Sequence, residues 1–321
     1  MEWQVLLLAI FSTLIVLMLL GFPVALSFIA INVVGAFIFF GSEAGLQQLI
    51  INMFSSLNTF MLVPIPMFIL MGELMFHSGI ALVVIDVVDK LLGRLPGRLC
   101  VLAVASGTIL ASLTGASMAS VAVLGSSLVP EMKKRGYSSH LSMGSILASG
   151  GLAVMIPPSS LAVLVGAIGE ISVGKILIAI IMPGLLMAIL YGAYIITRSW
   201  LQSSIAPAYD VSPSSLSEKL LGVVRYVLPL GTVVFLVIGV IFLGIATPSE
   251  AAASGCMGIL IVAALYRRLS WNAMKISVYQ TIKVTGMILL IVAGASSFSQ
   301  ILSFSGAITG LCRTGALRAS H

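Results

Sequence analysis

The chain has 321 residues, of which 60% are hydrophobic and only 8% are charged, and its mean hydropathy is +1.19. Soluble domains carry about 25% charged residues, so the composition excludes an ordinary soluble protein and predicts an all-α integral membrane protein embedded in a lipid bilayer. The formal net charge is +6, but the basic residues lie in loops between apolar runs. That distribution indicates membrane orientation and argues against nucleic-acid binding.

The first apolar runs, residues 3–20 and 24–40, are joined by the tripeptide GFP. As one helix of 38 residues they would be about 57 Å long, against a hydrocarbon core of about 30 Å, so we expect two helices with a tight turn. In residues 44–59 apolar residues recur at helical spacing and polar residues lie on the opposite face, which predicts an amphipathic helix along the interface. In the third run, residues 60–76, two prolines are expected to interrupt the helix, Pro64 and Pro66.

Two later runs contain residues that break helices. Residues 99–129 carry the small residues LTGAS near their centre, and residues 140–168 contain IPPSS. The remaining segments are, in chain order, a span at 176–197, a polar linker at 199–222, spans at 223–244 and 251–266, a second amphipathic stretch at 269–283, and a span at 284–302.

Whether residues 99–129 cross the membrane decides the predicted orientation. If they form a hairpin that enters and leaves by one face, then of the 16 Lys and Arg residues thirteen collect on one side, Lys175 lies on the other, and Arg313 and Arg318 belong to the tail. Such a bias is what the positive-inside rule describes. We therefore expect a re-entrant hairpin, a cytoplasmic linker and a periplasmic N-terminus.

The second half of the chain resembles the first. LLGFPVALS at 19–27 aligns with FLGIATPSEAAAS at 242–254, and each precedes an amphipathic stretch and a span with a glycine near its end. With one amphipathic stretch expected outside and the other inside, the repeats are inverted, as in many secondary transporters. The predicted organisation is a first repeat at 1–198, with scaffold helices at 1–59 and a transport part at 60–198, and a partial second repeat at 223–310.

The repeat also predicts that the chain lacks its last part. Partners of the hairpin and of IPPSS would lie near residues 340 and 380, so a complete chain would run to about 420 residues. The tail at 311–321 is basic and lacks periodicity. We expect a truncated form with an incomplete second repeat, and a non-transporting remnant is the alternative to an active subunit.

The tip of the hairpin is the first candidate site. Non-helical backbone at membrane depth must be buried or line an aqueous cavity; there, carbonyls and hydroxyls coordinate hard cations such as Na⁺, and helix N-termini attract anions. The alternative is that small residues only permit close helix packing. We expect packing for Ser106, Gly107, Ala111 and Ser120. The ion or substrate role is expected for Thr114, Gly115, Ala116 and Ser117, which Ser112 and Ser120 flank.

The second candidate site is the segment ASGGLAVMIPPSS at 148–160. The pairs Gly150-Gly151 and Pro157-Pro158 are expected to interrupt the helix twice. The prolines leave the carbonyls of Ala153 and Val154 without N–H partners. Those carbonyls are candidate Na⁺ ligands, with the hydroxyls of Ser159 and Ser160, although a kink for packing is the alternative. Two broken segments in one half predict a shared site near the membrane midplane.

The acidic residues are weaker candidates for a site. Glu73 is expected to pair with a neighbour near a helix end, Glu131 to lie beside the basic residues 133–135, and Glu250 to cap a helix started by Thr247. His140 is expected at a helix start. The sequence contains no phosphate-binding loop, zinc spacing or Ser/His pair, so it predicts neither an enzyme nor a bound cofactor, with Na⁺ only as a coupling ion.

Four segments resemble the signature sequences of one transporter family. PIPMFILMGELMFHSGI, SLTGASMASVAVLGSSLVPEMKKRGY, ASGGLAVMIPPSS and GIATPSEAAA are similar to segments of the large membrane subunit of TRAP (tripartite ATP-independent periplasmic) transporters. The resemblance covers about residues 1–310 in the same order. The family's hairpin tip usually reads SGSS, whereas this chain has TGAS, which retains a hydroxyl and the glycine. The family's second hairpin and its closing TPP break have no counterpart here.

The resemblance implies a bacterial inner-membrane, elevator-type importer that is usually coupled to Na⁺. Its substrates would be organic acids such as C4-dicarboxylates or sialic acid. Its partners would be a small TRAP membrane subunit and a periplasmic substrate-binding protein. By the same resemblance, residues 112–117 and 150–159 would form one half of the ion and substrate site. A membrane enzyme ranks below both the transporter subunit and the remnant, because no acid/base or nucleophile pair occurs.

Overall fold

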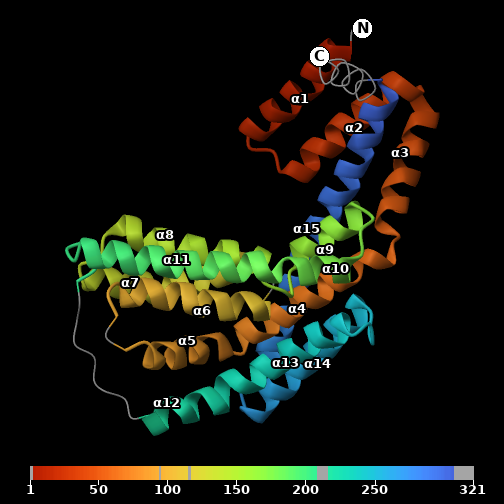
Figure 1. The fold of residues 1–321 in the computed structure, drawn as a ribbon. Coiled ribbons are helices and arrows are strands. Elements are labelled where there is room, and N and C mark those ends of the chain that lie inside the picture. The colour runs from red at the N-terminus through yellow and green to blue at the C-terminus, as the bar shows by residue number, and fades with distance from the viewer. Residues whose placement is uncertain (1–2, 94, 115–116, 208–215, 307–321) are drawn as a thin grey trace, which may run out of the picture. The chain divides into compact units, whose positions relative to one another are not determined.

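The computed structural model describes residues 3–93, 95–114, 117–207 and 216–306, and within these ranges the regular structure is helical (Figure 1). The predicted all-α fold is therefore confirmed. Contacts divide the chain into two compact units. One comprises the described residues up to Phe60 together with those from Lys283 onward, and the other comprises Met61–Ile282. The predicted inverted repeats and elevator motion stay predictions.

The first unit begins with two apolar helices, α1 (Trp3–Leu19) and α2 (Val24–Phe40), followed by α3 (Ser42–Leu57). The chain reverses between α1 and α2 at Gly21, whose φ is 87°, a conformation that suits glycine. The Phe22 N–H then donates to Leu17 O at 3.1 Å. The predicted tight turn between two short helices is confirmed.

The last part of α15 (Trp271–Phe304) packs against these helices within the first unit. The rings of Phe11 and Phe28 meet the ring of Phe298 edge-on, with centroids 5.9 and 5.2 Å away. The buried amide of Asn32 donates to Gly294 O at 2.7 Å. A polar side chain inside an apolar helix is thereby satisfied by a backbone carbonyl of another helix.

The structure corrects the expected separation of an amphipathic stretch at 269–283 from a span at 284–302. From Trp271 onward both belong to the single 34-residue helix α15. No proline occurs in it, and its first glycine is Gly286, so nothing in the sequence stops the helix between the two predicted segments. At 1.5 Å per residue the helix is about 51 Å long.

The core of the second unit is built around α4 (Pro64–His77), whose Ile65, Phe68 and Met71 are fully buried. A short 3₁₀ turn, Phe60–Leu62, precedes it. The prediction that prolines interrupt this run was wrong, because Pro64 and Pro66 lie in the first turn of α4. N–H groups of the first turn have no partner inside the helix, so proline costs little there.

Helix α14 (Pro248–Leu265) lies against α4, and the Cys256 thiol is 3.0 Å from Met67 O. Its start confirms the predicted cap. The Thr247 hydroxyl accepts from the Glu250 N–H at 3.3 Å, and the Glu250 carboxylate accepts from the Thr247 N–H at 2.8 Å. The other helices outside the candidate site are α5 (Ile80–Leu91), α10 (Val173–Ala179), α11 (Ile181–Leu201), α12 (Leu216–Gly222) and α13 (Leu228–Phe242), with a π-helical turn, Val223–Val227, between the last two.

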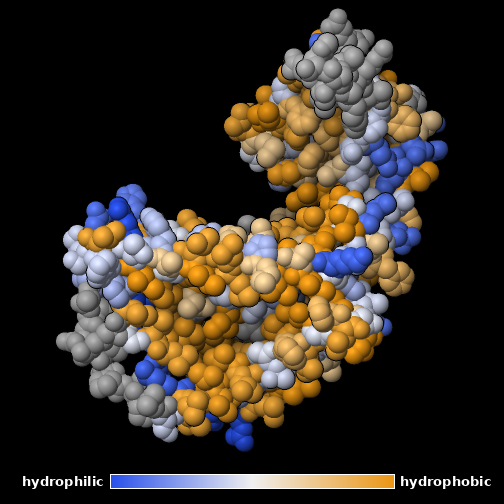
Figure 2. All heavy atoms as spheres, in the orientation of Figure 1, coloured by the Kyte–Doolittle hydropathy of each residue, from blue (hydrophilic) through white to orange (hydrophobic). Residues whose placement is uncertain are grey.

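Five stretches of helix among the described residues are long and apolar enough to cross a membrane, and a bent pair makes a sixth. On the face shown in Figure 2, hydrophobic residues cover most of the surface and hydrophilic residues gather near helix ends. Large apolar side chains such as Leu186, Phe235 and Ile261 are exposed. Contact of such a surface with lipid tails is favourable, whereas its contact with water is not.

Candidate functional site

The predicted hairpin is present as two helices, α6 (Arg98–Thr114) and α7 (Ser117–Lys134), which pack against each other. Gly115 and Ala116 lie outside the described residues, as do the side chains of Thr114 and Ser117. The nearby Ser112 hydroxyl donates to Ile109 O of its own helix at 2.8 Å. The change of direction therefore falls at the predicted tip, and the re-entrant path through the membrane stays a prediction.

The second predicted break separates α8 (Ser139–Met155) from α9 (Ser160–Ile168), whose axes differ by 46°. The expectation of two interruptions was half wrong. Gly150 and Gly151 lie inside α8, which runs through them to Met155. Glycine costs a helix roughly 1 kcal/mol relative to alanine, so the two residues weaken α8 without interrupting it. Gly150 is buried, whereas Gly151 is exposed, with nothing within 4 Å of an added Cβ.

The prolines end α8 in the way the sequence predicts. The Ile156 N–H makes the last helical bond, to Leu152 O at 2.9 Å. The next two carbonyls, those of Ala153 and Val154, would pair with Pro157 and Pro158, which have no N–H. Carbonyl oxygens are therefore left for another donor or for a cation at the end of α8.

Ser159 begins the second half of the broken helix. Its hydroxyl accepts from the Ala162 N–H at 3.3 Å, and its carbonyl accepts from the Val163 N–H at 3.1 Å. The residue is fully buried. Ser159 is thus the N-cap of α9, a structural role that leaves one lone pair of its hydroxyl for a ligand.

The hairpin turn and the helix break lie at the same end of two parallel helices. Near one end, the Cys100 thiol of α6 is 3.9 Å from Leu141 O of α8. Two turns further on, Gly107 faces Ser149 so closely that an added Cβ would overlap the serine side chain. The residue numbers rise together along both helices. Seven residues beyond Gly107 and Ser149, the end of α6 at Thr114 therefore lies beside about residues 156–157. The structure therefore places the end of α6, which precedes the predicted tip, alongside the break.

The small residues assigned to packing are buried along these helices. Gly107 provides the closest approach of α6 to α8. Ser106, Ala111 and Ser120 are at most 1% exposed. Small side chains allow membrane helices to approach closely and gain van der Waals contact. Their arrangement agrees with the packing interpretation.

Gly184 is a residue that the sequence did not single out. It lies near the start of α11, and a Cβ added there would be 2.5 Å from Met155 O and 3.0 Å from Ile156 Cγ1. Only glycine therefore lets α11 pack against the backbone of the break. The chain has 31 glycines, and nothing local to Gly184 distinguishes it from the others.

The acidic residues form pairs with basic residues or cap helices. The Glu73 carboxylate is 3.2 Å from His77 Nδ1 on the next turn of α4, and Glu131 is 2.6 Å from Arg135 Nη2 at the end of α7. His140 lies in the first turn of α8, as predicted. These positions agree with pairing and with helix ends.

Comparison with known proteins identifies the family. The family model described as "Tripartite ATP-independent periplasmic transporter, DctM component" matches residues 11–314. The chain belongs to this family. It is therefore a TRAP transporter large permease, a multi-pass protein of the inner membrane and a transport subunit rather than an enzyme.

Several curated large permeases are similar to this chain in sequence. The ectoine TRAP transporter large permease TeaC of Halomonas elongata is 33% identical over 300 residues, which are 92% of this chain and 68% of the relative. The ectoine/5-hydroxyectoine permease UehC of Ruegeria pomeroyi is 31% identical with the same coverage. The C4-dicarboxylate permease DctM of Rhodobacter capsulatus is 27% identical and covers 93% of this chain and 70% of that protein.

Proposed function

We propose that this TRAP large permease contributes one half of a Na⁺ and substrate site, formed where the α6–α7 turn meets the α8–α9 break. The observation that supports the proposal is the parallel register of α6 and α8, which places the end of α6 alongside the break. Where helical backbone is interrupted inside a membrane protein, its unpaired N–H and C=O groups need polar partners, because each unsatisfied group there costs several kcal/mol.

The chemistry of the site favours a hard cation. The carbonyls of Ala153 and Val154 and the hydroxyls of Ser112, Thr114 and Ser117 are neutral oxygen donors, which suit Na⁺. Pro157, Pro158 and the N-cap Ser159 end α8 and begin α9 beside these carbonyls. The further residues of the proposed site are Gly115, Ala116, Gly150 and Gly151. Two helix N-termini, those of α7 and α9, also begin at these interruptions. Their partial positive charge favours an anionic group of the substrate.

The proposed substrate is a small organic acid, a C4-dicarboxylate or a sialic-acid-like compound, imported by symport with Na⁺. The names of the relatives differ in substrate: two are ectoine permeases, one is an isethionate permease, and others are C4-dicarboxylate permeases. The proposal therefore extends to ectoine as an alternative. Delivery by a periplasmic binding protein, assembly with a small membrane subunit and a periplasmic N-terminus belong to the same proposal.

Uptake driven by an imposed gradient tests this function. The permease and its two partner proteins would be reconstituted in liposomes, and uptake of labelled substrate measured with an inward Na⁺ gradient. We expect uptake only with the gradient. Ser117→Leu should lower the rate about tenfold or more, because losing one charge-assisted contact costs about 1.5–3 kcal/mol. Gly115→Leu should also lower it, because a bulky apolar side chain obstructs a polar site. Ser126→Leu, the same substitution at an exposed position of α7, should leave it unchanged. Uptake without a gradient, or an unaffected Ser117→Leu variant, would refute the proposal.

A further inference from the structure

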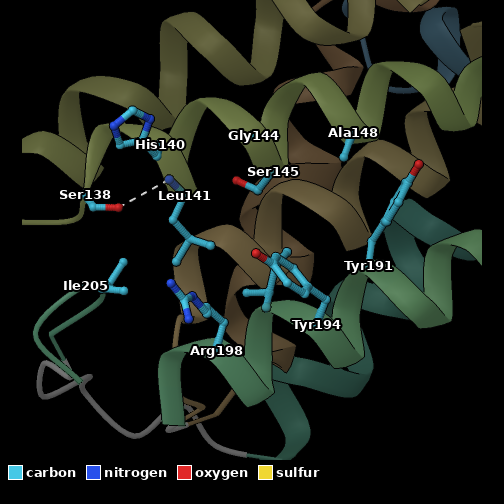
Figure 3. Close-up of a pocket in the computed structure, with 11 residues that line it drawn as sticks. Ser138, His140, Leu141, Gly144, Ser145, Ala148, Tyr191, Tyr194, Arg198 and Ile205 are labelled. Atoms are coloured by element: carbon cyan, nitrogen blue, oxygen red, sulfur yellow. Dashed lines mark hydrogen bonds between the residues drawn. The ribbon is translucent and has the colours of Figure 1, made fainter. Parts of the chain in front are cut away.

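A cavity of about 610 Å³ lies between α8 and α11, at the end of the second unit opposite the helix break (Figure 3). It is lined from one side by the first turns of α8 and from the other by the last turns of α11. Its volume lies within the range of about 300–1,000 Å³ that is typical of small-molecule sites. The lining residues are Ser138, His140, Leu141, Gly144, Ser145, Ala148, Tyr191, Tyr194, Ile195, Arg198 and Ile205.

One end of the cavity is polar and positively charged. Figure 3 shows Arg198 and Tyr194 extending from α11 toward Leu141 and Ser145 of α8, with His140 at the start of α8. Among the described residues that line the cavity, none is acidic. Lys133 and Lys134 are exposed at the end of α7, a few residues before α8 begins. The charge of this end therefore favours an anion.

The other end of the cavity is apolar and continues into the lipid-facing surface. Gly144 and Ala148 leave a shallow groove along α8, and beside it Met143, Leu147 and Leu190 are 55–65% exposed. From Arg198 to Tyr191 the groove extends for about 10 Å along α11. An occupant must therefore combine an anionic group with an apolar tail.

The polar end is closed by the chain that follows α11. The Ser138 N–H donates to Ile205 O at 2.9 Å, and the Ile205 N–H donates to Gln202 O at 3.0 Å. This segment fixes a wall beside the start of α8, so the site is a formed pocket with one open apolar side.

We propose that this cavity binds an anionic glycerophospholipid, with its phosphate at Arg198 and one acyl chain along Gly144 and Ala148. The guanidinium binds a phosphate through two parallel hydrogen bonds. The phenols of Tyr191 and Tyr194 would contact the glycerol and ester groups of the lipid, because tyrosine is enriched at membrane interfaces. Basic pockets between helices at this depth suit such head groups. The site is separate from the transport site, and it does not depend on the proposed Na⁺ coupling.

Native mass spectrometry of the full chain in detergent tests the site. The purified protein would be delipidated and titrated with phosphatidylglycerol or with phosphatidylcholine of the same acyl chains. We expect phosphatidylglycerol to bind with at least tenfold higher affinity. Arg198→Gln should weaken its binding about tenfold, since a hydrogen bond to a charged group is lost. Lys175→Gln, which removes an exposed charge near the far end of α11, should not.

A second variant keeps the test valid if Arg198→Gln fails to fold. Gly144→Leu fills the groove without a clash, because nothing lies within 4 Å of an added Cβ, and Gly125→Leu is the matched control on α7 with equally open space. Gly144→Leu should lose phosphatidylglycerol, and Gly125→Leu should retain it, and neither should lower the thermal midpoint. The proposal would be overturned by equal binding of the two lipids or by equal binding of phosphatidylglycerol to the Arg198→Gln and Lys175→Gln variants. It would also be overturned if millimolar inorganic phosphate displaced the lipid, or if a second protein chain occupied the cavity.

Discussion

At the scale of single residues, the helix break depends on a neighbour with no side chain. Gly184 lets α11 approach the Met155 carbonyl, to which an added Cβ would be 2.5 Å away. Because the obstructing atom is backbone, a larger residue can be accommodated only by moving α8 or α11. The same helix contains Gly192, around which nothing lies within 4 Å of an added Cβ.

The two glycines therefore predict effects of opposite sign. Gly184→Ala should lower the free energy of unfolding by about 1–3 kcal/mol, the usual cost of overpacking. Gly192→Ala should raise it by up to about 1 kcal/mol, because alanine favours the helix. Thermal unfolding in detergent, followed by a thiol-reactive dye that labels the buried Cys100 and Cys256 as they become exposed, measures both. Equal midpoints for the two variants would contradict the close contact.

The cap of α14 gives a second residue-level prediction. Thr247→Ala removes the hydroxyl that accepts from the Glu250 N–H, and it should destabilise the protein by about 1 kcal/mol. Thr247→Ser retains the hydroxyl and should restore most of the loss. The same dye assay measures both variants, and a Thr247→Ala midpoint equal to that of the unchanged protein would show that the cap contributes nothing.

At the scale of elements, the bend between α8 and α9 is attributed to two missing N–H donors. The variant Pro157→Ala/Pro158→Ala supplies donors for the carbonyls of Ala153 and Val154, so the helix should straighten from its 46° bend. Spin labels at the exposed positions Met143 and Val165 should then move apart.

A matched control separates this effect from a general effect of losing proline. Pro248→Ala makes the same change in the first turn of α14, where the N–H has no partner, and should leave the distance between the labels unchanged. An unchanged distance in the double variant would mean that packing, and not the prolines, sets the bend.

The elements also mark the limit of what the sequence predicts. The proline pair and the Thr247 cap act within a few residues, so local patterns were sufficient for them. Pro64 and Pro66 were expected to interrupt a helix, but they start it, because the helix begins only after the 3₁₀ turn at Phe60–Leu62. Gly150 and Gly151 stay helical because a glycine weakens a helix by only roughly 1 kcal/mol. Gly184 matters only through contact with a distant segment, which no local pattern reveals.

At the scale of the whole molecule, the predicted orientation rests on whether the hairpin is re-entrant. Helices α6 and α7 run beside each other, so their outer ends, near Gly93 and Lys134, should lie on the same side of the membrane. The positive-inside rule predicts that this side is cytoplasmic.

Labelling of single cysteines tests the path. In a variant without Cys100, Cys256 and Cys312, Gly93→Cys and Lys134→Cys should both react with an impermeant maleimide only from the cytoplasmic side. Lys175→Cys should react only from the periplasmic side. Labelling of positions 93 and 134 from opposite sides would mean that one arm of the pair crosses the membrane, and it would reverse the orientation of everything that follows.

The central claim is that the hairpin turn and the helix break supply Na⁺ ligands in one half of the transport site. Equilibrium binding of radioactive sodium to the purified permease tests it without requiring transport. We predict saturable binding that K⁺ does not displace, about tenfold weaker or more in Pro157→Ala/Pro158→Ala because a charge-assisted ligand is lost, and unchanged in Pro248→Ala. Absence of saturable binding to the unchanged permease, or equal binding by the two proline variants, would contradict the claim.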